Sequence, residues 1–92
     1  MVSSNKQLDA QLKSIKTNTT RIEIEIVKYK NNKINAEHLE QEFTKMCERL
    51  DANVDRFEKE YKFDPDSILE LMNEANNAIA NTQLAIDVAI GQ

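Results

Sequence analysis

The 92-residue sequence contains almost no residues of the kind that make turns, since it has one glycine, Gly91, and one proline, Pro65. An all-β domain needs a turn signal about every 8–12 residues, so that class of fold is excluded. Tryptophan is absent and the only cysteine is Cys47. A single cysteine excludes an internal disulfide and a cysteine-based zinc cage, and it favours a reducing, intracellular setting, which we take to be cytoplasmic.

Long apolar runs are also missing. No segment approaches the roughly 18 uninterrupted apolar residues of a membrane span, and the first residues do not have the apolar run of a secretory signal. The triplet that starts at Asn18 matches a glycosylation acceptor, which we interpret as chance without such a signal. Apolar residues make up 40% of the chain and charged residues 30%, which indicates a folded chain rather than a disordered one. We expect one helical domain over residues 1–92.

What the sequence does contain is a heptad repeat of apolar residues in three stretches. The steps between these residues are mostly four and three, which predicts helices over 5–30, 36–62 and 65–90. Ile24 and Val27 fall off the first seam, so they form either a second contact face or isolated exposed side chains. The three seams are Leu8, Leu12, Ile15, Thr19, Ile22, Ile26 and Tyr29; Ala36, Leu39, Phe43, Met46, Leu50, Val54, Phe57 and Tyr61; and Ile68, Met72, Ala75, Ile79, Thr82, Ile86 and Ala89.

Two short breaks separate the helices. Asn35 suits an N-cap, and Asp64 with Pro65 suits the start of the third helix, because proline at the first helical position loses no hydrogen bond. Each helix would be about 40 Å long at 1.5 Å per residue. Matched lengths and short connections predict an all-α, antiparallel up-down-up three-helix bundle with coiled-coil-like heptad packing. In that arrangement Thr19 and Thr82 share a central, mildly polar layer.

Charge is unevenly distributed along the chain. Residues 1–33 carry a net charge of +4, residues 34–63 carry −3 and residues 64–92 carry −5. These charges either pair within the bundle, which stabilises it modestly, or leave an acidic face on helices 2 and 3 that attracts a basic partner. Because the whole chain is acidic, with a pI near 5.0, nucleic acid is not the expected partner.

Residues that carry chemistry are few. His38 with Glu42, four residues on, is half of a metal site at most, and we interpret both as solvated residues at a helix start. Cys47 has no histidine at a suggestive spacing and is interpreted as a small core residue. The lone glycine near the end of the sequence excludes a glycine-rich phosphate loop. We therefore expect no enzymatic activity, no cofactor and no metal.

The remaining function is binding of another protein, through helices 2 and 3. We expect a small helical adaptor or subunit of a larger assembly, because apolar residues outside the seams would exceed what a small monomer exposes. An alternative is a monomeric bundle that holds one partner, since the plan of three helices resembles tubulin-folding cofactor A and the N-terminal domains of syntaxin-type SNAREs. That resemblance is to the plan alone and implies no binding residues. A second alternative is a homo-oligomeric coiled coil. The candidate partner-binding residues are Leu69, Leu84, Asp87, Val88 and Ile90.

Overall fold

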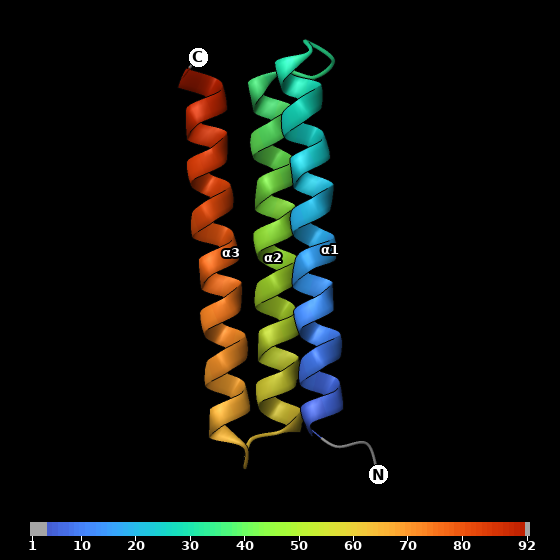
Figure 1. Ribbon diagram of the computed structural model, residues 1–92, viewed down its shortest axis with the longest axis vertical. Coiled ribbons are helices and arrows are strands. Elements are labelled where there is room, and N and C mark those ends of the chain that lie inside the picture. Colours follow the sequence, from blue (N-terminus) through green and yellow to red (C-terminus); the bar gives the residue numbers. More distant parts are fainter. Residues whose placement is uncertain (1–3, 92) are drawn as a thin grey trace.

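The computed structural model describes residues 4–91, which form three α-helices that pack side by side (Figure 1). Helix α1 spans Ser4–Lys30, α2 spans Ala36–Glu60 and α3 spans Pro65–Gly91. Each helix contacts the other two, and no strand occurs among the described residues. The molecule is a rod with extents of 48 × 19 × 15 Å. The predicted all-α fold of three helices is confirmed.

The course of the chain is visible in Figure 1. α1 rises from the end marked N, α2 returns, and α3 rises to the end marked C. Contacts between α1 and α2 agree with this course. Arg49 of α2 contacts Asn18, whereas Asn53, further along α2, contacts Ser14, which comes earlier in α1.

The C-terminus of α1 is closed by two backbone hydrogen bonds. The Lys33 amide donates to the Lys28 carbonyl at 2.8 Å, and the Asn32 amide donates to the Tyr29 carbonyl at 3.0 Å. This double closure requires a left-handed residue, and Asn32 supplies it with a φ of 60°. Asparagine is one of the few residues other than glycine that adopts this conformation readily, so α1 ends without a glycine.

The start of α2 follows the prediction. The Asn35 side chain accepts a hydrogen bond from the His38 amide at 2.8 Å, which satisfies a backbone donor that has no partner within the helix. Ile34 and Leu39, on either side of this cap, both pack in the core. Such a pair fixes the angle at which the chain enters the helix.

The second connection is longer than expected, because α2 ends at Glu60, two residues before its predicted end. Tyr61 leaves the helical region with φ −119° and ψ 40°, and its carbonyl accepts from the Asp64 amide to close a turn. The Asp64 carboxylate then accepts from the Ser67 amide at 3.3 Å and from its hydroxyl at 2.8 Å. Asp64 thus caps α3 immediately before Pro65, as predicted.

The core follows the predicted seams with one shift in α3. Met72, expected inside, is 39% exposed, whereas its neighbour Leu71 is 1% exposed. The first turns of α3 bury Ser67, Leu71 and Ala75, a spacing of four, because the helix presents a slightly rotated face to its neighbours there. The buried apolar residues are Leu8, Ile15, Ile22, Ile26, Leu39, Met46, Leu50, Phe57, Leu71, Ala75, Ile86 and Ala89.

A polar side chain also lies in the interior. Asn18, 7% exposed, donates to the Ser14 carbonyl at 2.9 Å and accepts from Arg49 Nε at 2.8 Å. Thr82 is buried as predicted, and Thr19 is half-buried with its hydroxyl bonded to the Ile15 carbonyl. Because its polar atoms have partners, Asn18 can be buried without the large cost of an unsatisfied group.

Candidate protein-binding surfaces

A groove of about 310 Å³ lies between α2 and α3, in the half of the bundle near their connection. Val54, Met72 and Ala75 give it an apolar floor, and none of its lining residues is basic. Its three carboxylates form no ion pair with any other residue from 4 to 91. We call this the acidic groove. Its lining residues are Asp51, Val54, Asp55, Glu58, Met72, Ala75 and Asn76.

The negative potential of the acidic groove is not reduced by basic residues of α3. This helix contains no lysine or arginine over Pro65–Gly91. Carboxylates that line a hollow with low-dielectric walls produce a concentrated field, which attracts oppositely charged groups. The exposed part of Met72 lies directly in this field, so the groove combines apolar contact area with negative charge.

Three of the predicted partner residues lie on the same side of α3 as the acidic groove: Leu69, Asp87 and Ile90. Residues seven apart share a face of a helix, and Leu69 precedes the groove residue Asn76 by seven. Gln83 and Ile90 follow Asn76 by seven and fourteen, and Gln83 donates to Asp87 at 2.8 Å. Leu69 is 56% exposed, whereas Ile90 packs partly against the core and offers less surface than expected.

The other two predicted residues, Leu84 and Val88, lie towards α1 on the surface of α3. They follow Asn77 and Asn81 by seven, and both asparagines line a groove between α1 and α3. The side chains of Leu84 and Val88 are 64% and 52% exposed. The five predicted residues thus lie along both grooves beside α3, and Leu84 is one helical turn from both Asp87 and Val88.

The groove between α1 and α3 has a volume of about 500 Å³ and changes character along its length. The section lined by residues of 15–23 and 74–81 is polar apart from Ile15 and Ala78. Val27 follows its lining residue Thr20 by one heptad, just as Val88 follows Asn81, so the two valines flank the next section of the same groove. The groove is lined by Ile15, Lys16, Thr19, Thr20, Glu23, Glu74, Asn77, Ala78 and Asn81.

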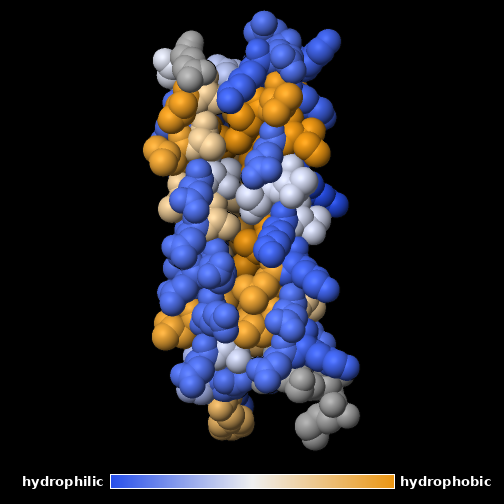
Figure 2. All heavy atoms as spheres, in the orientation of Figure 1, coloured by the Kyte–Doolittle hydropathy of each residue, from blue (hydrophilic) through white to orange (hydrophobic). Residues whose placement is uncertain are grey.

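Exposed apolar side chains gather at this next section. Ile24 and Val27 of α1 are 51% and 55% exposed and line a shallow, mostly apolar hollow of about 390 Å³. Figure 2 shows apolar side chains near the upper end of the rod, on the left over α3 and on the right over α1. We call Ile24, Val27, Leu84 and Val88 the apolar patch. Of the two interpretations of Ile24 and Val27, a second contact face is the one this clustering favours.

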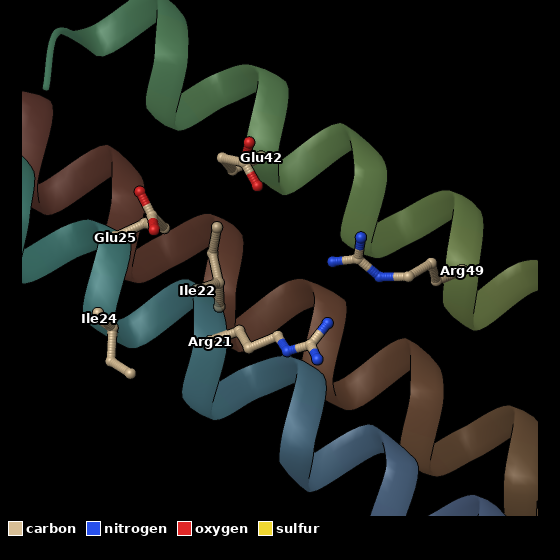
Figure 3. A pocket seen from close by; sticks show the side chains of 6 residues that line it. All are labelled: Arg21, Ile22, Ile24, Glu25, Glu42 and Arg49. Carbon is tan, nitrogen blue, oxygen red and sulfur yellow. The ribbon is translucent and has the colours of Figure 1, made fainter.

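Between α1 and α2 lies a smaller hollow of about 190 Å³ whose charges balance (Figure 3). Arg21 and Arg49 point toward each other at one end of it, Glu25 and Glu42 lie at the other end, and Ile24 points away from α2. Arg49 is already held by Asn18. The hollow therefore has no net charge, although its positive and negative groups lie at opposite ends.

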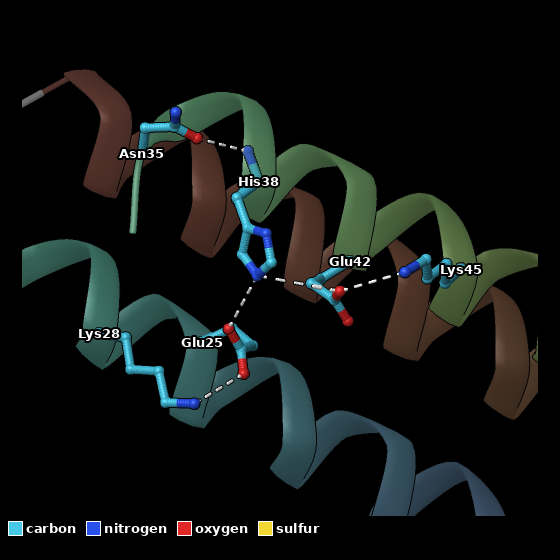
Figure 4. Close-up of polar contacts among 6 residues, drawn as sticks. All are labelled: Glu25, Lys28, Asn35, His38, Glu42 and Lys45. Atoms are coloured by element: carbon cyan, nitrogen blue, oxygen red, sulfur yellow. Dashed lines mark hydrogen bonds and ion pairs between the residues drawn. The ribbon is translucent and has the colours of Figure 1, made fainter. Parts of the chain in front are cut away.

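His38 lies at one end of the same face, between two carboxylates (Figure 4). Its Nε2 is 3.7 Å from Glu25 Oε2 and 3.9 Å from Glu42 Oε1. Lys28 and Lys45 contact the same two carboxylates at 3.2 and 3.4 Å. No group of histidine, cysteine and acidic side chains suited to a metal ion occurs among residues 4–91. The cluster is a network of polar contacts at the surface, in which the contact of His38 with Glu25 links α2 to α1.

Cys47 is half-buried on α2 and free of a disulfide. Burial raises the pKa of its thiol, and the carboxylates of Asp51 and Glu48 raise this pKa further. A reactive cysteine requires the opposite shift, because the thiolate is the nucleophile. The environment of Cys47 therefore argues against a reactive thiol, but the residue is half-buried and is not among the buried core residues, where it was expected.

One exposed aromatic residue was not singled out by the sequence reasoning. Phe63, in the connection between α2 and α3, is 89% exposed, and the Lys62 ammonium lies 5.1 Å from the centre of its ring. Its position between a charged residue on each side, in a segment that has left the helix, is the only signal that the sequence offers for this exposure.

Within residues 4–91, no helix has the length and apolar character needed to cross a membrane. Comparisons with protein-family models, with curated proteins and with solved structures find no match for this chain.

Proposed function

We propose that the chain is a non-enzymatic protein-binding module, a small helical adaptor or subunit of a larger intracellular assembly, that binds its partner in the acidic groove. In this proposal an antiparallel up-down-up bundle with coiled-coil-like packing is the rigid frame, and α2 and α3 provide the binding face. The observation that carries it is a groove with an apolar floor, three carboxylates without ion pairs and no basic lining residue.

The chemistry of the groove defines the partner segment. An amphipathic helix binds in a groove through apolar side chains at spacings of three, four and seven. Met72 and the exposed Leu69 offer contact area for such side chains, while lysine or arginine residues beside them would meet Asp51, Asp55 and Glu58. Long-range attraction of this kind accelerates association and weakens as salt is added.

An interaction role is also supported by how the chemically capable residues are placed. The Cys47 thiol has a raised pKa, and His38 lies on the α1 side of α2 with Glu25 and Glu42. Nucleophilic catalysis needs a nucleophile and a base within hydrogen-bonding distance. These two residues are nine positions apart on α2 and belong to different faces.

The proposal is tested by affinity capture from the native source, with the captured protein identified and its segment then measured as a peptide. A variant that neutralises the groove, Asp51→Asn with Asp55→Asn and Glu58→Gln, should bind the peptide at least about tenfold more weakly, because three opposing charges are lost. The wild-type dissociation constant should rise with salt, and that of the variant should rise less.

The matched control neutralises three exposed carboxylates elsewhere, Asp9, Glu37 and Glu48, and should leave peptide affinity unchanged. Equal loss in both variants would show that overall charge, and not the groove, attracts the partner. Peptide binding that neither salt nor the groove variant alters would contradict the proposed site.

A further inference from the structure

The face formed by α1 and α3 carries two different kinds of surface along the rod. Towards the upper end it carries the apolar patch, whose four side chains are each more than half exposed. Two of them belong to α1 and two to α3. Val27 and Val88 flank one groove at the same height, since each lies one heptad beyond residues that line the groove together. Leu84 lies one turn before Val88, and Ile24 lies one turn before Val27.

The part of this face nearer the start of α1 is charged. On the α1 side Lys13 and Lys16 outnumber the exposed Asp9, which lies seven residues before Lys16, and Glu23 lines the groove further along; the α3 side carries acidic charges only. Lys13 and Lys16 lie on the α1 side: Lys16 lines the groove, and Lys13 is exposed seven residues before the lining residue Thr20. Glu70 and Glu74 lie on the α3 side: Glu74 lines the groove, and Glu70 is exposed seven residues before Asn77. None of these four charged side chains forms an ion pair with another described residue.

We propose that this face binds a second copy of the chain, in a dimer whose two-fold axis runs parallel to the helices. That axis places α1 of one protomer opposite α3 of its partner at the same height. Ile24 and Val27 then meet Leu84 and Val88 of the partner, and the lysines of α1 face the glutamates of α3. The same two-fold rotation pairs the apolar patch and the charged part of the face, and each contact occurs twice.

The other simple pairing of the same face matches its two parts less well. A two-fold axis across the rod would place α1 against α1 and α3 against α3. Such an axis also reverses the partner, so each height on one protomer faces the mirrored height on the other. With the axis at the middle of the rod, the apolar patch of each protomer faces the charged part of its partner; with the axis at the patch, the charged parts extend past the contact. Neither position places Lys13 and Lys16 against glutamates of α3, so the axis parallel to the helices is the one that pairs both parts of the face.

The dimer leaves the acidic groove free, because that groove lies on the other side of α3. It is independent of the proposed partner binding, and either can fail without the other.

The first experiment measures mass against concentration by sedimentation equilibrium. The wild-type mass should rise from 10.6 kDa to twice that value, with the association unchanged when Thr44 and Ala52, which are exposed on α2, are both replaced by Asp. Leu84→Asp with Val88→Asp should raise the dissociation constant of the dimer at least about tenfold, since two charges are placed in an apolar contact. A wild-type protein that stays at 10.6 kDa up to millimolar concentration, or a dimer that tolerates the Leu84 and Val88 changes, overturns the proposal.

The second experiment exchanges charge and does not touch the apolar patch, so it remains decisive if the aspartate variant unfolds. Lys13→Glu with Lys16→Glu makes both helices of the face acidic, and Glu70→Lys with Glu74→Lys makes both basic. Each variant alone should dimerise at least about tenfold more weakly than the wild type, because like charges then face each other.

An equal mixture of the two charge variants should recover a dimer that contains one copy of each. In the mixture every acidic helix faces a basic helix, on both sides of the two-fold axis. Native mass spectrometry distinguishes the mixed dimer from the two self-dimers when one variant is isotope-labelled. Self-dimers that remain as strong as the wild-type dimer would contradict the proposed face, as would a mixture that recovers no dimer.

Discussion

Removal of the Asn18 side chain should destabilise the bundle through one identifiable contact. In the wild type, Asn18 Oδ1 accepts a 2.8 Å hydrogen bond from the Arg49 guanidinium, which joins the middle of α1 to the middle of α2. A hydrogen bond to a charged group contributes about 1.5–3 kcal/mol. Arg49 is half-buried and can regain water, so we take the lower end, and Asn18→Ala should lower the free energy of unfolding by about 1–2 kcal/mol.

The contribution of the contact itself is isolated by a double-mutant cycle. Asn18→Ala, Arg49→Ala and the double variant are unfolded in urea at one fixed protein concentration, because an association equilibrium would otherwise shift the midpoint. We expect a coupling energy of about 1 kcal/mol and an unchanged denaturant slope. A chain of this length loses roughly 4–8 °C of Tm per kcal/mol, so thermal unfolding gives a second readout.

A matched control removes a hydroxyl that bonds only within its own helix. Thr44 Oγ1 donates to the Glu40 carbonyl on the exposed face of α2, and Thr44→Ala should change stability by less than about 0.5 kcal/mol. A coupling energy between Asn18 and Arg49 below about 0.3 kcal/mol, within the usual scatter of additivity, would refute the view that this pair stabilises the packing of α1 on α2.

Three further outcomes follow from the core, the first connection and the thiol. Leu50→Ala should cost about 2–5 kcal/mol in urea unfolding, since Leu50 is 1% exposed and its removal leaves a cavity. Asn32→Ala should cost about 1 kcal/mol by the same assay, because alanine is strained at φ 60°, whereas Asn32→Gly should not destabilise. Cys47 should react with iodoacetamide more slowly in the folded chain than in urea at pH 8, because burial and the nearby carboxylates raise the pKa of its thiol. The stability that this shift contributes is present at low pH and is lost as pH rises through the folded pKa. The free energy of unfolding should therefore fall at alkaline pH more in the wild type than in Cys47→Ser.

The features that the sequence predicts best are those decided by local hydrogen bonding. Asn35 and Asp64 cap α2 and α3 as expected, because a side-chain oxygen placed just before a helix finds free backbone donors whatever the rest of the fold does. The end of α1 follows the same logic but was not anticipated, since it depends on Asn32 adopting a left-handed conformation, and glycine is the residue that signals this in a sequence.

Features that depend on how the helices are rotated against one another were predicted less well. Met72 lies in an unbroken heptad seam and yet is 39% exposed, because the heptad pattern does not define which of two adjacent positions faces the centre of a three-helix core. Asn18 was read only as part of a chance acceptor triplet, since its burial becomes favourable only when Arg49 of another helix is near.

The candidate surface was predictable in composition but not in layout. Leu69, Leu84 and Val88 are exposed as the sequence suggests, and α3 presents acidic and apolar residues without basic ones. The division of these residues between two grooves depends on the positions of α1 and α2 around α3, which a single sequence does not specify. The acidic groove, where Met72 contributes to the floor, could not be found without that arrangement.

An odd number of helices has a mechanical consequence. α1 starts at one end of the rod and α3 finishes at the other (Figure 1), so a force applied between these two points acts along the helix axes. The helices must then slide past one another, and the side-chain contacts distributed over a length of 48 Å resist together, in shear. A hairpin of two helices, pulled from its neighbouring ends, would open one contact at a time. Pulled in an optical trap, this bundle should therefore yield in a single abrupt step.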